Sequence, residues 1–179
     1  SLGVLGESLF SFPEGVGFRK ENSALREQFN RFLAELKASG VHADMVDRWM
    51  ERNVTDMPAI ANSGSNGELV VGISDGTLPF AAGKDGRLIG FEIELGERFA
   101  AYLGRKVRFS QIDFSGLIAA VASGKVDMIV SAIFITEERK QSIAFSDPYY
   151  EEATKVFALK RNIAAYDAAG EAASPQSFL

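Results

Sequence analysis

The chain has 179 residues, of which 46% are hydrophobic and 24% are charged, and its formal net charge at pH 7 is −5. This composition is typical of a globular domain with a sizeable core, and the negative charge argues against nucleic acid as a partner because phosphate binding needs a basic surface. The absence of cysteine excludes disulfides, zinc–thiolate sites and a thiol nucleophile.

Further classes of protein are disfavoured by motifs that the sequence lacks. No apolar run approaches the roughly 20 residues of a membrane-spanning helix, and the first residues lack the pattern of a signal peptide. There is no P-loop, dinucleotide-binding fingerprint or metal-ligand cluster, so we predict no cofactor and no metal. Because the chain begins at Ser1, we interpret it as an excised piece of a longer protein.

The first third of the chain predicts a short strand at 15–20 and two helices. Asn22 or Ser23 can cap the first helix, which Gly40 ends. A second helix is expected from about residue 43 to residue 52, with His42 on the surface or in a capping role. Residues 54–67 are rich in Asn, Ser, Gly and Pro and predict a flexible linker. The apolar stripe of the first helix consists of Leu25, Phe29, Phe32, Leu33 and Leu36.

From residue 68 onward, strands and helices alternate. The pattern predicts a strand at 69–73, a loop at 74–80, a turn at 84–87, an amphipathic helix at 91–103 and a strand at 107–109. It continues with a helix at 115–122, a buried strand at 126–130, a short helix that opens at Thr136 and an aromatic-rich strand that ends at Tyr150. A helix that connects two such strands forms a βαβ unit, which predicts an α/β fold with parallel strands. In such folds, ligands bind beyond the carboxyl ends of the strands.

Arg139 is the leading candidate for a binding residue. It falls in the first turn of the helix that Thr136 caps, close to the carboxyl end of a strand. Its planar guanidinium can hold a carboxylate through two parallel hydrogen bonds. The alternative is an ordinary surface ion pair with Glu138, Asp127 or Asp147.

Two stretches carry a resemblance to a known family. DFSGLIAAVASGKVDMIVSAIFITEERKQSIAFSDPYY and ELVVGISDGTLPFAAGKDGRLIGFEIELGERFAAYLGRKVRFSQI resemble extracellular solute-binding proteins of family 3, which bind polar amino acids. The likeness covers about residues 68–160. It implies a three-layer αβα lobe of a type II periplasmic binding protein, on the periplasmic or extracellular side of the membrane.

A third stretch, GVGFRKENSALREQFNRFLAELKASGVHADMVDRWMERN, looks like the carboxyl-terminal end of the same family. The expected organisation is therefore permuted: residues 1–53 supply the terminal strand and helices, 54–67 the linker, 68–160 the amino-terminal part of the lobe, and 161–179 a crossover or disordered tail. Tandem modules or one permuted module explain this order, and residues 1–160 could form a single lobe. The linker length also allows a swapped homodimer.

The resemblance implies that the ligand is a small molecule, an amino acid or a related carboxylate. Arg139 would take its carboxylate, Phe114 would contact its side chain, and Ser131 and Ala132 would offer backbone groups. The loop residues Ser74, Asp75 and Thr77 would add polar contacts. Each has a structural alternative: Phe114 as a core aromatic, Asp75 as a turn former, and Ser131 as a strand-end hydroxyl.

The sequence departs from the family at two of these positions. Phe134 replaces a hydroxyl residue that would donate to the carboxylate, and Thr77 replaces an aromatic residue that often stacks on the ligand. Losing one hydrogen bond to a charged group costs about 1.5–3 kcal/mol. A weaker site or a non-standard ligand would follow.

The resemblance implies a binding module of an ABC-type uptake transporter, with a membrane permease as partner. The alternative is a sensory input domain of a membrane signalling protein such as a histidine kinase with tandem modules. An enzyme is disfavoured, because no paired carboxylates, catalytic histidine or nucleophile accompany the cleft motif.

Overall fold

The computed structural model describes residues 2–74, 76 and 78–159, with residues 2–10 and 153–159 described by their backbone alone. The chain forms two compact units, residues 13–150 and residues 1–12 together with 151–179. The second unit holds most of strands β1 (Leu2–Glu14) and β9 (Tyr150–Leu159), which pair into a two-stranded sheet. The expected tail at 161–179 lies outside the described residues.

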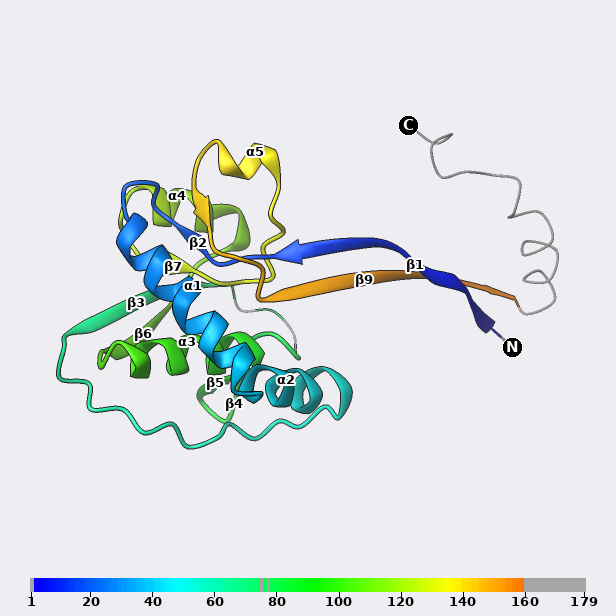
Figure 1. The fold of residues 1–179 in the computed structure, drawn as a ribbon, viewed down its shortest axis with the longest axis horizontal. Coiled ribbons are helices and arrows are strands. Elements are labelled where there is room, and N and C mark those ends of the chain that lie inside the picture. Colours follow the sequence, from blue (N-terminus) through cyan, green and yellow to red (C-terminus); the bar gives the residue numbers. More distant parts are fainter. Residues whose placement is uncertain (1, 75, 77, 160–179) are drawn as a thin grey trace. The chain divides into compact units, whose positions relative to one another are not determined.

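A five-stranded mixed sheet forms the centre of the first unit (Figure 1). Strand β3 runs parallel to both of its neighbours, whereas β2 runs antiparallel to both of its own. Since β2 precedes the linker, a segment from the start of the chain lies inside the sheet. The strand order is β6 (Lys106–Gln111), β3 (Glu68–Ile73), β7 (Met128–Ile129), β2 (Gly17–Phe18) and β8 (Ala144–Phe145).

Helices cover both faces of this sheet. Leu69 and Val71 of β3 belong to one hydrophobic cluster together with α1 and α3, whereas Val70 packs against a second cluster that contains α4. Successive side chains of β3 thus point to opposite faces of the sheet, as expected of a strand that is buried on both faces. The predicted three-layer α/β fold is therefore confirmed. The helices are α1 (Ser23–Ala38), α2 (Val41–Val46), a π-helix η1 (Asp47–Glu51), α3 (Phe91–Tyr102), a 3₁₀ turn η2 (Phe114–Gly116), α4 (Leu117–Ala122) and α5 (Glu137–Lys140).

The predicted apolar stripe of α1 is buried along its whole length, from Leu25 to Leu36. Phe29 is central to it: its ring centroid lies 5.8 Å from that of Phe18 in β2 and 5.0 Å from that of Phe99 in α3. Aromatic pairs at such distances stabilise the fold beyond the contribution of the apolar area that they bury. Helix α1 therefore packs against a strand on its own side of the linker and a helix on the other.

Three predicted elements have different boundaries. The helix expected at 43–52 starts at Val41 and widens into a π-helix from Asp47. The helix expected at 115–122 opens with a 3₁₀ turn. The strand expected at 126–130 is shorter and spans only Met128–Ile129. The flanking amides of Asp127 and Val130 still donate to carbonyls of β3, at 2.9 and 3.0 Å. The turn at 84–87 joins two paired strands, as expected: β4 (Ala82–Lys84) and β5 (Arg87–Ile89).

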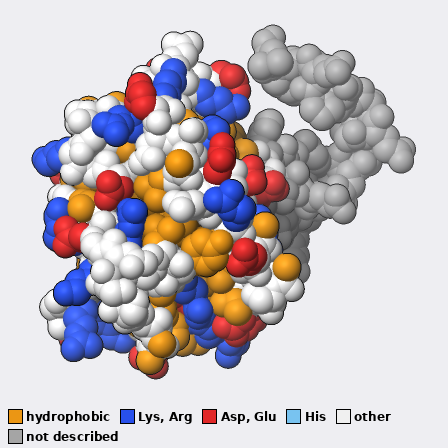
Figure 2. All heavy atoms as spheres, turned by 60° about the vertical axis from the view of Figure 1, so that its left-hand side comes forward, with side chains coloured by type: hydrophobic (Ala, Val, Ile, Leu, Met, Phe, Trp, Pro, Cys, Tyr) orange, Lys and Arg blue, Asp and Glu red, His pale blue; other side chains and the backbone are white. Residues whose placement is uncertain are grey.

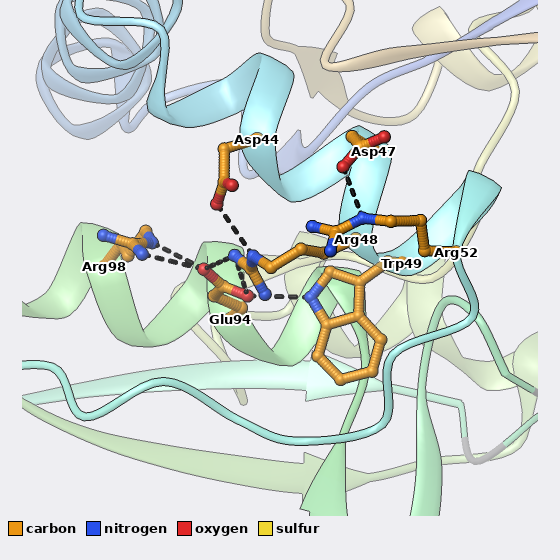
Figure 3. A network of polar contacts seen from close by, with 7 residues as sticks. All are labelled: Asp44, Asp47, Arg48, Trp49, Arg52, Glu94 and Arg98. Atoms are coloured by element: carbon orange, nitrogen blue, oxygen red, sulfur yellow. Dashed lines mark hydrogen bonds and ion pairs between the residues drawn. The ribbon is translucent and has the colours of Figure 1, made fainter.

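A buried carboxylate joins η1 to α3 (Figure 3). Glu94 is fully buried, and its Oε1 accepts hydrogen bonds from Arg48 and Arg98 at 2.8 and 2.9 Å. Its Oε2 accepts one from Nε1 of Trp49 at 2.7 Å, and Arg48 also pairs with Asp44 at 2.7 Å. The two guanidinium groups offset the cost of desolvating the carboxylate.

The linker at 54–67 runs as an extended segment from η1 to β3 (Figure 1). Its second half is hydrogen-bonded to the turn between α3 and β6: Nδ2 of Asn62 donates to the carbonyl of Arg105 at 2.6 Å, and Nδ2 of Asn66 to that of Leu103 at 2.9 Å. The side chain of Met57 packs against the core. On the face shown in Figure 2, basic and acidic side chains are interspersed.

Removal of the Glu94 side chain should cost more stability than removal of a carboxylate at the surface. We expect Glu94→Ala to lower the free energy of unfolding by about 3 kcal/mol, because it strands two partly buried guanidinium groups and the indole N–H of Trp49. Fluorescence of Trp49, the only tryptophan, can follow unfolding in urea.

Glu68→Ala is the matched control, since Glu68 pairs with Arg108 at 2.8 Å on the surface. Exposed pairs contribute about 0–1 kcal/mol. Equal losses in the two variants would contradict a structural role for the Glu94 network.

Candidate functional site

The carboxyl ends of the parallel strands β6, β3 and β7 lie at one edge of the sheet. The chain leaves β3 at Ser74, leaves β7 toward Ser131, and leaves β6 toward Phe114. The backbone amide of Ser74 donates to the hydroxyl of Ser131 at 3.0 Å, which joins the two strand ends. This edge is where open α/β sheets bind ligands.

A cavity of about 230 Å³ opens at this edge. It is lined by Ser74, Gly76, Phe80, Ala81, Glu92, Phe114, Ser131 and Ala132. Four predicted site residues, Ser74, Phe114, Ser131 and Ala132, are thus brought together. Phe114 is 47% exposed, so it is not a core aromatic. A volume of this size suits a small polar molecule that is only partly enclosed.

Gly90 brings the start of α3 to the cavity. Its φ of +136° and the 2.1 Å that would separate an added Cβ from the carbonyl oxygen of Phe80 exclude any side chain there. With this close approach, the amides of Phe91 and Glu92 donate to the carbonyls of Pro79 and Phe80 at 2.8 and 3.0 Å. Glu92 consequently enters the cavity wall beside Phe80.

Arg139 lies beside Phe114, one of the residues that line the cavity. Its helix is capped as predicted, because the Arg139 amide donates to the Thr136 hydroxyl at 3.2 Å. The guanidinium carbon is 5.7 Å from the centre of the Phe114 ring, and Nη1 donates to the carbonyl of Phe134 at 2.9 Å. Among the described residues, no carboxylate forms an ion pair with Arg139. The alternative pairings with Glu138, Asp127 and Asp147 are therefore absent.

Glu92 is a buried carboxyl in the cavity wall that the sequence did not reveal. Its Oε1 accepts a hydrogen bond from the Ala132 amide at 2.5 Å and another from the Tyr149 hydroxyl. Burial raises the pKa of Glu92 to about 7, although both hydrogen bonds act in the opposite direction. Burial and the nearby carboxylates of Glu92 and Glu14 raise the pKa of Tyr149.

The strand end at Ala132 has an unusual backbone. Ala132 has a φ of +45°, which is uncommon for a residue with a side chain. The hydrogen bond from its amide to Glu92 stabilises this conformation and occupies the N–H group that we expected to be offered to a ligand. For Ala132 that expectation needs correction, because its amide already has a protein partner. The Ser131 hydroxyl accepts from the Ser74 amide, in line with its stated alternative as a strand-end hydroxyl.

Other sequence predictions have different outcomes. Phe134 does not line the cavity and contributes its carbonyl to Arg139. Asp75 and Thr77 lie outside the described residues. His42 is half-buried and makes no side-chain capping bond at the start of α2: its Nε2 lies 2.7 Å from the carbonyl oxygen of Tyr149, and burial lowers its pKa. The reason is that α2 packs beside the start of α3, where the His42 ring meets Phe91 edge-on.

A larger cavity of about 1230 Å³ lies between the linker and the β4–β5 hairpin. Its wall contains charges of both signs and residues of β6, Gln111 at the strand end among them, but no residue of β3 or β7. Within the described part of the chain, no three acidic, histidine or cysteine side chains cluster as a metal site would require. In the same part, no helix has the length and apolar character to cross a membrane.

An α/β lobe with a cavity at its strand ends has the arrangement in which open α/β sheets bind small molecules. The sequence profile of the bacterial extracellular solute-binding proteins, family 3, matches residues 69–166. The chain belongs to this family.

Two curated relatives illustrate the match. A probable histidine-binding protein of Campylobacter jejuni is 40% identical over 94 residues, which is 52% of this chain and 37% of that protein. The arginine-binding extracellular protein ArtP of Bacillus subtilis is 36% identical over 93 residues, which is 50% of this chain and 36% of that protein. The chain thus spans little more than a third of their length.

Among solved structures, the arginine-bound form of domain 1 from TmArgBP is 32% identical in sequence. The match covers 60% of this chain and 94% of that one, with a TM-score of 0.47.

The raised pKa of Glu92 predicts how stability depends on pH. The folded state holds the Glu92 proton up to about pH 7 and the unfolded state only to its ordinary value of 4.5. The contribution of Glu92 to stability is therefore lost as the pH rises through 7. As the pH rises from 5 to 8, the natural chain loses stability that Glu92→Gln keeps. We expect the free energy of unfolding of Glu92→Gln to rise by about 2–3 kcal/mol relative to that of the natural chain over this range.

Urea unfolding at four pH values measures this difference. Glu137→Gln, which alters an exposed residue of α5, should follow the natural chain at each pH. A constant offset between Glu92→Gln and the natural chain would show that Glu92 does not titrate in this range.

Proposed function

We propose that this chain carries the ligand-binding lobe of an extracytoplasmic amino-acid-binding protein that serves an ABC-type uptake transporter. The observation that carries the proposal is the cavity at the strand ends, with the Arg139 guanidinium beside Phe114 of its lining. Within the described residues this guanidinium forms no ion pair. Membership in an extracellular solute-binding family and two relatives named for amino acids support it. The sensory alternative has no comparable support.

Arg139 is the group that would take the ligand carboxylate. Its bond to the Phe134 carbonyl uses one of five N–H donors and fixes the side chain beside Phe114. The remaining donors can form the paired hydrogen bonds that carboxylates accept. An aromatic face beside the guanidinium also favours an ordered cation.

We further propose that residues 1–53 complete a lobe whose other part is residues 68–160, with residues 54–67 as the linker. The position of β2 between β7 and β8 and the packing of α1 on α3 support this assembly. In a parent with tandem modules, the same contacts would join the end of one module to the start of the next. Exchange of the segment between two copies would give a homodimer with the same contacts.

The first test is binding by the chain itself. A single lobe leaves much of a ligand in water, whereas ligand pockets bury about 70–90% of the surface of their ligand. We therefore expect L-arginine and L-histidine to bind more weakly than micromolar. Amide chemical shifts measured up to tens of millimolar should change at Ser74, Ser131 and Ala132.

Two results would contradict this account. No shift change with any of the twenty standard amino acids would refute amino-acid binding at this cavity. Micromolar affinity would instead refute the claim that one lobe encloses too little of the ligand.

The second test concerns Arg139. We expect Arg139→Gln to weaken L-arginine binding about tenfold to a hundredfold, since one charged hydrogen-bonding partner is lost. Agmatine, which lacks the carboxylate, should be unaffected by this substitution. Lys140→Gln alters the neighbouring cation, which pairs with Glu137 at 2.7 Å, and should change neither affinity. If Arg139→Gln weakens the binding of L-arginine and agmatine equally, Arg139 does not bind the ligand carboxylate.

A further inference from the structure

The outer edge of the sheet opens onto the larger cavity. Strand β6 stands at one end of the strand order and pairs with β3 alone. The amide of Lys106 donates to the carbonyl of Gly67 at 2.8 Å, and the amide of Ile112 donates to that of Ile73 at 2.9 Å. The even-numbered residues of β6 therefore direct their backbone groups toward β3. Because the backbone groups of successive residues point to opposite edges of a strand, the odd-numbered residues direct theirs away from the sheet.

Val107 and Phe109 are odd-numbered residues of β6, and both line the cavity. Within the described residues, neither has a protein partner for its backbone N–H or C=O group. The linker covers the edge just before β6, where Nδ2 of Asn62 donates to the carbonyl of Arg105 at 2.6 Å. Farther along, the linker, which runs extended below β6 in Figure 1, lines the cavity with residues 55–59. An open strand edge of this kind is a template for pairing with another strand.

The cavity suits an extended chain better than a small molecule or a second copy of the sheet. Its volume of about 1230 Å³ exceeds the roughly 300–1,000 Å³ of pockets for small molecules. A second sheet would have to displace the linker, which is held by the packing of Met57 on the core and by a hydrogen bond of 2.9 Å from Lys84 to Thr55. A single strand, which would lie about 4.8 Å from β6, can enter without that change.

Glu97 of α3 gives this cavity a specific chemistry. It is half-buried in the cavity wall, and no ion pair or hydrogen bond of its side chain is found within the described part of the chain. Burial and the nearby carboxylate of Glu94 raise its pKa. The wall around it includes the apolar side chains of Ile93, Leu88 and Phe109. A lysine or arginine between apolar residues would complement this wall.

The cations of the cavity wall do not neutralise Glu97. Arg108 pairs with Glu68 at 2.8 Å, and Lys84 is bonded to Thr55. In the part of the chain that the structure describes, Arg87 forms no ion pair. The carboxyl group of Glu97 is therefore available to a cation from outside.

We propose that this cavity is a docking groove for an extended peptide segment of a partner protein, which adds a strand to β6 and places a lysine or arginine against Glu97. The side chains of Val107 and Phe109 pack against the cluster that contains α3. Alternate residues of the added strand would face the same way, so the basic residue is flanked by apolar residues two positions away. In strand addition, backbone bonds supply affinity and alternate side chains supply specificity. This surface is separate from the cavity at the strand ends, and the inference does not depend on the ligand bound there.

The test uses the peptide acetyl-Gly-Thr-Val-Ser-Lys-Ser-Val-Thr-Gly-amide and the whole chain at pH 8. At saturating peptide, the amides of Val107 and Phe109 should exchange with solvent at least tenfold more slowly, because they gain hydrogen-bond acceptors. The amides of Arg108 and Ser110 should keep their rates, since they already face β3. A peptide with glutamate in place of the lysine should bind at least tenfold more weakly, the value of one charged hydrogen bond.

Two variants separate the backbone from the charge. Val107→Pro removes an N–H group that faces away from β3, so the sheet should persist while peptide affinity falls about tenfold. In Glu97→Gln, which keeps the fold even if the proline variant does not, the preference for the lysine peptide should disappear. Asp85→Asn, which alters an exposed carboxylate of the same cavity, should retain that preference.

Three results would overturn the inference. If the peptide binds and the amides of Val107 and Phe109 keep their exchange rates, it does not add a strand to β6. If the lysine and glutamate peptides bind the natural chain equally, Glu97 is not the partner of the cation. If n-butylammonium binds beside Glu97 as tightly as the peptide does, the cavity holds a small cation and not an extended chain.

Discussion

The lobe depends on the buried carboxylate of Glu94, which links two parts of the chain that the linker separates. Arg48 and Trp49 come from the segment before the linker, and Arg98 comes from α3 itself. Because the carboxylate is fully buried, these donors are needed to offset the cost of removing it from water. Docking of the leading helices and burial of α3 are therefore coupled.

Helix α3 also connects this contact to the cavity. Glu92 and Glu94 are two residues apart, so they project from different sides of the helix. Glu94 faces two guanidinium groups and an indole N–H, whereas the bonds described for Glu92 come from a backbone amide and a phenol hydroxyl. The first carboxylate is neutralised by the protein. The second is held by two neutral donors, and burial raises its pKa to about 7.

The sequence predicted the elements whose pattern is local and repetitive. The stripe from Leu25 to Leu36 and the Thr136 cap required only the helical period and capping chemistry. Ser74, Phe114, Ser131 and Ala132 could be expected to converge because parallel strands end at a common edge. Glu92 was missed because a glutamate in the first turn of an amphipathic helix ordinarily faces solvent. Its burial follows from the contact between Gly90 and Phe80 and from Tyr149, which lies 57 residues away. Neither contact leaves a periodic signal.

The central claim, that segments on both sides of the linker form one cooperative unit, is tested most directly by native-state hydrogen exchange in low urea. The account predicts that the amides of α1, β2 and α3 open with the same free energy, equal to that of global unfolding. Exchange of α1 and β2 at a much lower free energy than α3 would show that the leading segment detaches on its own, and would contradict the account.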